Sequence, residues 1–262
     1  MKLNYNHPFH MVNYSPWPII SSWGVMIFMM GTIKMFHKMS NSVMTLGLII
    51  IIITSIQWWR DVIRESTNQG FHTNKVAMNM KWGMIMFIIS EILFFTSFFW
   101  AFFHSSLAPS MELGMNWPPK NINSFNPFKI PLLNSIILLS SGISVTWTHQ
   151  MVILNNKKKS ILSLLITIML GVYFTAIQMM EYIEAPFSIN DSIYGTTFFL
   201  TTGFHGLHVI IGTIMLSTSI VRLKNNHFSK IHHFGLEATI WYWHFVDVVW
   251  LFLFIFLYWW SK

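Results

Sequence analysis

Ionisable side chains interrupt three stretches of this sequence that are otherwise apolar. Glu91 lies among phenylalanines in IISEILFFTSFFW. His205 and His208 are three residues apart in GFHGLHVIIG. The same spacing separates His244 from Asp247 in WYWHFVDVVWLFLF. Residues three apart share one face of a helix, and polar groups are costly inside a membrane span, so each of these side chains is a candidate functional group.

Two kinds of role are open for the acidic residues. Glu91 could handle protons or face lipid, or it could hydrogen-bond to a neighbouring helix, and its apolar surroundings favour the neutral acid. His244 and Asp247 could relay protons, but a satisfied, neutralised buried pair is the stronger interpretation. As a coupling pair, Glu91 and Asp247 would indicate a secondary transporter. The sequence shows no internal repeat of the transporter kind, which weakens that alternative.

The histidines raise the possibility of metal or haem ligation. Two histidines on neighbouring turns of one helix cannot occupy the two opposite axial positions of a haem, so His205 and His208 would need partners such as His244 and His149. A haem-binding electron carrier is therefore an alternative, and hydrogen bonding between helices is favoured over it. The glycines around the first pair predict close helix packing, and they are Gly203, Gly206 and Gly212.

A second kind of site lies at the end of an apolar stretch, where aromatic and basic residues cluster. Trp58 and Trp59 are followed by two arginines, of which Arg64 is the second, and by His72. Tryptophan is typical of the membrane interface, and an arginine can hold a phosphate group with two hydrogen bonds. The cluster favours a lipid headgroup site over simple anchoring. Arg222, with its basic neighbours, is a second and weaker candidate.

The composition identifies the elements that must position these groups. Hydrophobic residues make up 53% of the 262 residues and charged residues only 10%, with a mean hydropathy of +0.51. These values predict an all-α, polytopic membrane protein, because only helices satisfy their own backbone hydrogen bonds over about 20 apolar residues. Seven spans are predicted, at Trp17–Phe36, Ser42–Trp59, Met84–Phe103, Leu132–Ile153, Ile161–Met180, Thr196–Ile220 and Ala238–Trp260.

The basic residues predict the orientation of the chain. Eleven Lys and Arg fall on the side of the N-terminus and five on the other, so the N-terminus should face the positive-inside compartment and the C-terminus the opposite one. Two connections, Arg60–Lys81 and His104–Ile130, are longer than crossing requires, and the second should be irregular. We predict a domain boundary at the first connection, Arg60–Lys81. It divides residues 1–70, a two-helix hairpin, from residues 71–262, a five-helix bundle.

Several classes of function are excluded by what the sequence lacks. There is no cysteine, which removes thiolate metal sites, iron–sulfur clusters and cysteine nucleophiles. The basic residues are spread over many loops, which argues against nucleic acid as a partner. No phosphate-binding glycine loop, Gly-x-Ser-x-Gly elbow or His-Glu-x-x-His helix is present. Any chemistry should therefore be membrane chemistry or belong to a partner.

The same motifs resemble a known family over the whole chain. The strings that carry the resemblance are HPFHMVNYSPWP, WWRDVIREST, FIISEILFFTSFFWAFFHSSLAPS, MEYIEAPFSINDSIYGTTFF, GFHGLHVIIGT and WYWHFVDVVWLFLF. Together they are similar to subunit III of mitochondrial cytochrome c oxidase. Each is too long and too irregular to arise from general hydrophobicity.

The resemblance implies both an architecture and a role. It implies seven helices of the inner mitochondrial membrane, two and five of them around a lipid-filled cleft, with the N-terminus in the matrix and the C-terminus in the intermembrane space. Haem a and copper would belong to subunits I and II, and this chain would carry no cofactor and no catalytic centre of its own. It would pack against subunit I in a complex with accessory subunits, bind phospholipid and sustain proton uptake for the pumping oxidase.

The resemblance also assigns roles to single residues. It implies that phospholipid is bound by Trp59, Arg64, His72, Glu91 and Arg222. It implies structural, hydrogen-bonding roles for the remaining intramembrane groups, which are His205, His208, His244 and Asp247. Two positions depart from the pattern of the family, which often has histidine where this chain has Phe71 and Gln150. These departures would change local lipid contacts or surface protonation.

Overall fold

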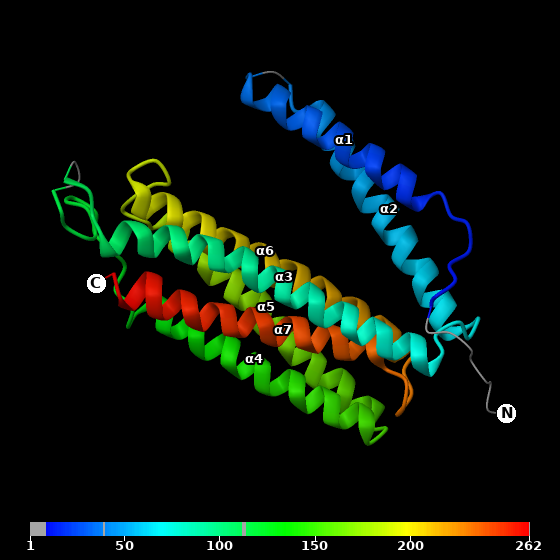
Figure 1. Ribbon diagram of the computed structural model, residues 1–262. Helices are drawn as coiled ribbons and strands as arrows, with labels where there is room; N and C mark the ends of the chain where they lie inside the picture. Colours follow the sequence, from blue (N-terminus) through cyan, green and yellow to red (C-terminus); the bar gives the residue numbers. More distant parts are fainter. Residues whose placement is uncertain (1–8, 39, 112–113, 262) are drawn as a thin grey trace. The chain divides into compact units, whose positions relative to one another are not determined.

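The computed structural model describes residues 9–38, 40–111 and 114–261 (Figure 1). Lys2 and Lys262, which contribute to the predicted orientation, and the start of the HPFHMVNYSPWP string lie outside this part. Over the described residues there is no strand, and seven helices are long and apolar enough to cross a membrane. The helices are α1 (Trp17–Phe36), α2 (Ser42–Thr67), α3 (Asn74–Leu107), α4 (Ile130–Ile153), α5 (Lys157–Ile183), α6 (Ile193–Lys224) and α7 (Phe234–Leu253), the last continued by a π-helical segment, Phe254–Trp259.

All seven predicted spans are confirmed, but most helices extend beyond them. The largest difference is at Arg60–Lys81, which was predicted to be a long connection. There, α2 continues to Thr67 and α3 begins at Asn74, so only residues 68–73 connect them. An apolar stretch marks only the part of a helix that lies in the hydrocarbon. The backbone hydrogen bonds of the helix can continue beyond it through turns of polar residues. The second long connection is irregular as predicted, over its described residues between α3 and α4.

The chain divides into two compact units, residues 1–80 and 81–262. In the first unit, α1 and α2 form an antiparallel hairpin whose backbones approach closely (Figure 1). Gly31 of α1 faces the backbone of Met44, and Gly47 of α2 faces the backbone of Phe28, with no room for a Cβ atom at either glycine. Small residues let membrane helices pack at short range. These two glycines therefore define the contact within the hairpin.

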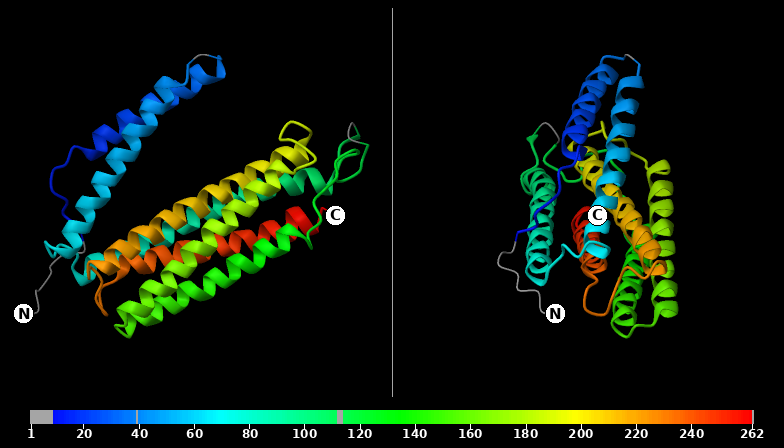
Figure 2. Two further views of the ribbon diagram at one scale, coloured as in Figure 1. Left: turned by 180° about the vertical axis from the view of Figure 1, so that it is seen from behind. Right: turned by 90° about the vertical axis from the view of Figure 1, so that its right-hand side faces the viewer.

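The second unit contains most of α3 and all of α4–α7, which form a helical bundle (Figure 2). Its centre is α7, where Trp243 and Trp250 are almost completely buried. The indole N–H of Trp243 donates to the Ser141 hydroxyl of α4 at 2.9 Å, and that of Trp250 donates to the Ser135 hydroxyl at 2.9 Å. A buried indole needs such a partner. These two bonds fix antiparallel α4 and α7 against each other.

Glycines of the bundle make room for one of these indoles. A Cβ atom at Gly171 of α5 or at Gly212 of α6 would meet the Trp243 ring, at 2.6 Å and 2.8 Å respectively. The predicted close packing is therefore correct for Gly212. It is wrong for Gly203 and Gly206, because a Cβ atom there would meet nothing within 4 Å. Those two glycines lie on other faces of α6, which the spacing in the sequence did not distinguish.

Most hydroxyl groups of the bundle bond to their own helix, three or four residues back, as is usual for Ser and Thr inside apolar helices. Four of these hydroxyl groups also make contacts between α4 and α5. Ser144 lies 2.8 Å from the Thr167 hydroxyl, and Thr148 lies 2.8 Å from the Ser163 hydroxyl. These pairs join α4 to α5 on the face of α4 that also receives the tryptophans.

Candidate functional site

Glu91 of α3 bonds to His208 of α6 inside the bundle. The Glu91 Oε2 atom lies 2.9 Å from His208 Nε2, while His208 Nδ1 lies 2.6 Å from the carbonyl oxygen of Phe204. The His208 ring packs edge-on against Phe95 and is stacked with Tyr242. The carboxyl group thus lies in an aromatic environment, as the sequence predicted, and its partner is on another helix.

These contacts fix how many protons the pair holds. A carbonyl oxygen can only accept, so His208 Nδ1 must carry a hydrogen and donate it to Phe204. One further proton then lies between Nε2 and the Glu91 carboxyl, either on the imidazole or on the acid. Both arrangements leave the pair with no net charge. A neutral pair suits a side chain that is 23% exposed on an apolar helix face, since an isolated charge there would be costly.

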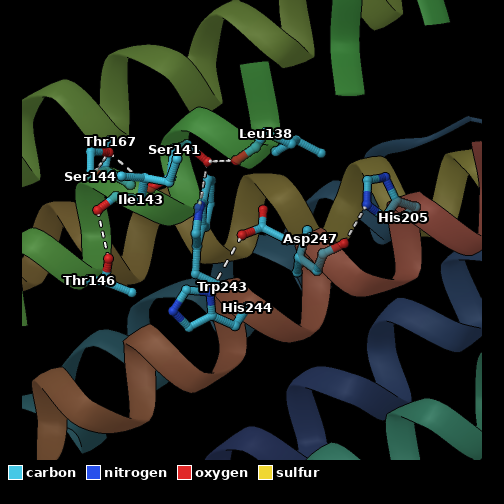
Figure 3. Close-up of polar contacts among 11 residues, drawn as sticks. Leu138, Ser141, Ile143, Ser144, Thr146, Thr167, His205, Trp243, His244 and Asp247 are labelled. Atoms are coloured by element: carbon cyan, nitrogen blue, oxygen red, sulfur yellow. Dashed lines mark hydrogen bonds and ion pairs between the residues drawn. The ribbon is translucent and has the colours of Figure 1, made fainter. Parts of the chain in front are cut away.

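The second polar group joins α4, α6 and α7 (Figure 3). His205 is buried, and its Nε2 lies 3.2 Å from the Val246 carbonyl oxygen of α7. Asp247, the next residue of α7 after Val246, is buried with its Oδ2 atom 3.6 Å from His244 Nδ1. His205 therefore contacts the backbone directly before Asp247, and its ring makes no hydrogen bond to the Asp247 carboxyl group.

Gly142 of α4 provides the space that Asp247 occupies. A Cβ atom at Gly142 would lie 2.7 Å from Asp247 Oδ2 and 3.8 Å from His244 Cε1. Any larger residue would displace the carboxyl group from this position. The sequence indicated the pairing of His244 with Asp247. It did not indicate that the absence of a side chain at Gly142 makes the space for the Asp247 carboxyl group.

The haem alternative finds little support in this geometry. Both ring nitrogens of His208 are engaged in hydrogen bonds, and one nitrogen of His205 is. Among the described residues, two groups bring three His, Asp or Glu ligand atoms within 4.8 Å of one another, and neither contains His205, His208 or His244.

In the first unit, an open pocket of ≈ 330 Å³ lies beside the end of α2. Arg64 and His72 line it, as does Trp58. Trp59 is 66% exposed and is not among the lining residues. Further polar residues also line the pocket, and they are His10, Asn13, Ser15, Asp61, Glu65 and Gln69. The pocket therefore combines indole rings with cationic and hydrogen-bonding groups.

Acidic residues that the sequence analysis did not select shape this pocket. Asp61 accepts a hydrogen bond from the Trp17 indole at 2.6 Å, and its other oxygen lies 3.0 Å from Arg60 and 3.9 Å from Arg64. Glu65 is buried, 3.2 Å from His10 Nε2. Asp61 and Glu65 are four residues apart, about one helical turn, and this spacing could have indicated that both face the pocket. Arg64 remains 57% exposed at the rim, with its guanidinium group accessible.

Arg222, the remaining candidate, lies in the second unit at the end of α6. Its guanidinium carbon is 4.3 Å from the centre of the Phe228 ring, a cation–π contact. The same group packs against Gly235, where a Cβ atom would overlap it. Arg222 is thus held by the turn between α6 and α7.

One buried ionisable residue is not among the candidates that the sequence indicated. Glu181, near the end of α5, is buried, and one turn before it Gln178 accepts a hydrogen bond from Asn134 of α4 at 3.2 Å. The sequence assigned Glu181 to the connection that follows the fifth span. Its spacing of three from Gln178 could have placed both on one buried face.

Comparison with known proteins agrees with the resemblance of the motifs. The family model described as "Cytochrome c oxidase subunit III" matches residues 7–262. Proteins named cytochrome c oxidase subunit 3 match over nearly their whole length. The one from Drosophila melanogaster is 60% identical over 261 residues, covering 100% of both chains. Those from Locusta migratoria and Pisaster ochraceus are 58% and 54% identical, covering 99% of this chain and 98% and 100% of the relatives. This chain therefore belongs to the cytochrome c oxidase subunit III family.

Proposed function

We propose that this chain is a non-redox core subunit of cytochrome c oxidase in the inner mitochondrial membrane. In this role it packs against subunits I and II, together with accessory subunits, and the haem a and copper centres belong to its partners. It supports electron transfer from cytochrome c to oxygen and the coupled proton pumping, by scaffolding subunit I and sustaining proton uptake. Its N-terminus faces the matrix and its C-terminus the intermembrane space.

Family membership is the observation that carries this proposal. The polar groups of the bundle support a role without redox chemistry of its own. His205 bonds to a backbone carbonyl, and the Glu91–His208 pair is internally neutral, so both are occupied in holding helices together. Large apolar side chains cover the outside of α1, α2 and α3, which suits helices that face lipid or partner subunits.

Phospholipid binding is the second part of the proposal. In the pocket of the first unit, Arg64 offers a planar set of donors for a phosphate group, and His72 offers a ring nitrogen or N–H. Trp58 in its wall and Trp59 beside it suit the interface where headgroups lie. In the second unit, Glu91 and Arg222 are the proposed lipid contacts.

Purification from the native membrane tests the assignment to the oxidase. In a mild detergent, the chain is expected to copurify with subunits I and II, identified by mass spectrometry. The same fraction should show the visible absorbance of haem a. A chain that came out alone and colourless would contradict the assignment and would turn attention to transport.

The lipid proposal is tested by replacing Arg64 and His72 together with leucine in the purified oxidase. Loss of a charged hydrogen bond to phosphate is worth about 1.5–3 kcal/mol, so the affinity for tightly bound phospholipid should fall at least about tenfold. The measurement is phospholipid per complex by mass spectrometry, with the lifetime of the enzyme during turnover. Lys75→Leu is the control, because it removes a basic side chain that is exposed in the same unit and lies outside the pocket lining. Unchanged lipid content and lifetime in the double variant would refute this role.

A further inference from the structure

Two histidines and a glutamate meet where α4 ends and α7 begins, and the proposed function does not use them. His149 belongs to the last turns of α4, His233 precedes α7, and Glu237 lies in the first turn of α7. His233 is buried and the other two are half-buried. We call this trio of residues the end cluster. Its three ligand atoms lie within 4.8 Å of one another.

The distances within the end cluster match the edges of a metal coordination shell. His233 Nε2 lies 3.3 Å from His149 Nε2 and 3.2 Å from Glu237 Oε1. Zinc bonds to nitrogen and oxygen ligands are about 2.0–2.1 Å long, and two ligands of a tetrahedron with such bonds are about 3.3 Å apart. The spacing of the ligand atoms is therefore that of a zinc site.

Hydrogen bonding around His233 points its free electron pair into the end cluster. Its Nδ1 lies 3.0 Å from the Ser229 carbonyl oxygen, which can only accept, so Nδ1 carries the hydrogen. In the neutral ring, Nε2 is then an acceptor that faces the acceptor Glu237 Oε1 and, at 3.3 Å, His149 Nε2, whose role depends on the tautomer of that ring. A single proton can form a hydrogen bond between only two of the three atoms, which are His149 Nε2, His233 Nε2 and Glu237 Oε1. A divalent cation would engage all three at once.

Groups outside the trio are arranged as they are around bound metals. A ligating histidine usually donates its other N–H to a backbone carbonyl, as His233 does to Ser229. A ligating carboxylate is usually held by a further partner. Here the outer oxygen of Glu237, Oε2, lies 2.7 Å from the Lys81 ammonium group of α3, which leaves Oε1 directed at the histidines.

We propose that His149, His233 and Glu237 bind a zinc ion, with a fourth position open to water. Two imidazoles and one carboxylate suit Zn²⁺, whereas Mg²⁺ and Ca²⁺ prefer oxygen ligands. Bound there, the ion joins the end of α4 to the start of α7. The competing interpretation is a polar network in which Lys81 alone balances Glu237.

Zinc binding to the full chain in detergent micelles tests this proposal. After treatment with a chelator, Zn²⁺ is titrated by calorimetry, and X-ray absorption at the zinc edge gives the ligands. We expect a site with two imidazole ligands that is weakened at least about tenfold in His149→Gln and in Glu237→Gln. His104→Gln, at the exposed far end of α3, is the matched control and should bind as the original chain does.

The design separates this site from the other trio in the chain, His10, Glu65 and His72. His10→Gln should leave the tight site intact. Zinc that is lost in His10→Gln and retained in His149→Gln would overturn the proposal, as would an original chain that binds no zinc. His149→Gln preserves the Lys81–Glu237 ion pair, and circular dichroism checks that each variant keeps its helix content.

Discussion

Trp243→Ala is expected to destabilise the five-helix unit by about 3–5 kcal/mol, the range for removing a large aromatic side chain from a packed core. Trp243 is completely buried, and its ring lies against Gly171 and Gly212 of two other helices. The substitution leaves a cavity between glycines that have no side chains to fill it. It also removes the donor to Ser141. Thermal unfolding in detergent should show a fall in Tm of about 10 °C.

Two further variants separate the causes of this effect. Trp243→Phe keeps much of the ring but loses the hydrogen bond to Ser141, so a smaller loss is expected, to which the bond contributes about 1 kcal/mol. Trp259→Ala removes the same side chain where it is 56% exposed and should change stability by no more than about 0.5 kcal/mol. Equal effects at Trp243 and Trp259 would contradict the assignment of Trp243 to the centre of the core.

Gly31→Leu and Gly47→Leu are each expected to separate α1 from α2. A side chain at either glycine collides with the backbone of the opposite helix, which cannot rotate away as a flexible side chain can. Overpacking costs about 1–3 kcal/mol in ordinary cores, and we expect the upper end of that range or more here. Limited proteolysis of the chain in detergent, monitored at the connection between the two helices, should accelerate strongly.

Gly83→Leu in α3 is the matched control for these substitutions, because a Cβ atom at Gly83 meets nothing within 4 Å. Leucine also has a higher helix propensity than glycine, so this variant should be neutral or slightly more stable. If Gly31→Leu and Gly47→Leu resisted proteolysis as the control does, the close approach of α1 and α2 would be wrong.

The helices could be predicted from the sequence because burial in lipid leaves a strong local signal. Trp17–Phe36 was predicted to the residue, since the limits of its largely apolar stretch coincide with the ends of the helix. The start of α3 at Asn74 was missed by ten residues, because Lys75 and Lys81 end the apolar run without ending the helix. Hydropathy therefore predicts which residues lie in the hydrocarbon, whereas backbone hydrogen bonding determines where the helix begins and ends.

The partners of the polar residues could be predicted only where both lie on one helix. The spacing of His244 and Asp247 indicated their pairing, which the structure contains. Glu91 and His208 are 117 residues apart, and nothing local to either indicates the other. The end cluster was missed for the same reason, because it combines an ordinary histidine at the end of one span with residues at the start of another. Contacts between helices depend on packing that a single sequence does not display.

The two indole bonds between α4 and α7 also determine how the bundle meets its bilayer. Trp243 and Trp250 are two turns apart on α7, and their acceptors Ser141 and Ser135 are spaced almost equally on α4. Sliding one helix along the other would break both bonds together, so the bundle cannot shorten or lengthen to suit its surroundings. The hydrophobic thickness of the bundle is then fixed, and a thinner or thicker bilayer has to deform around it.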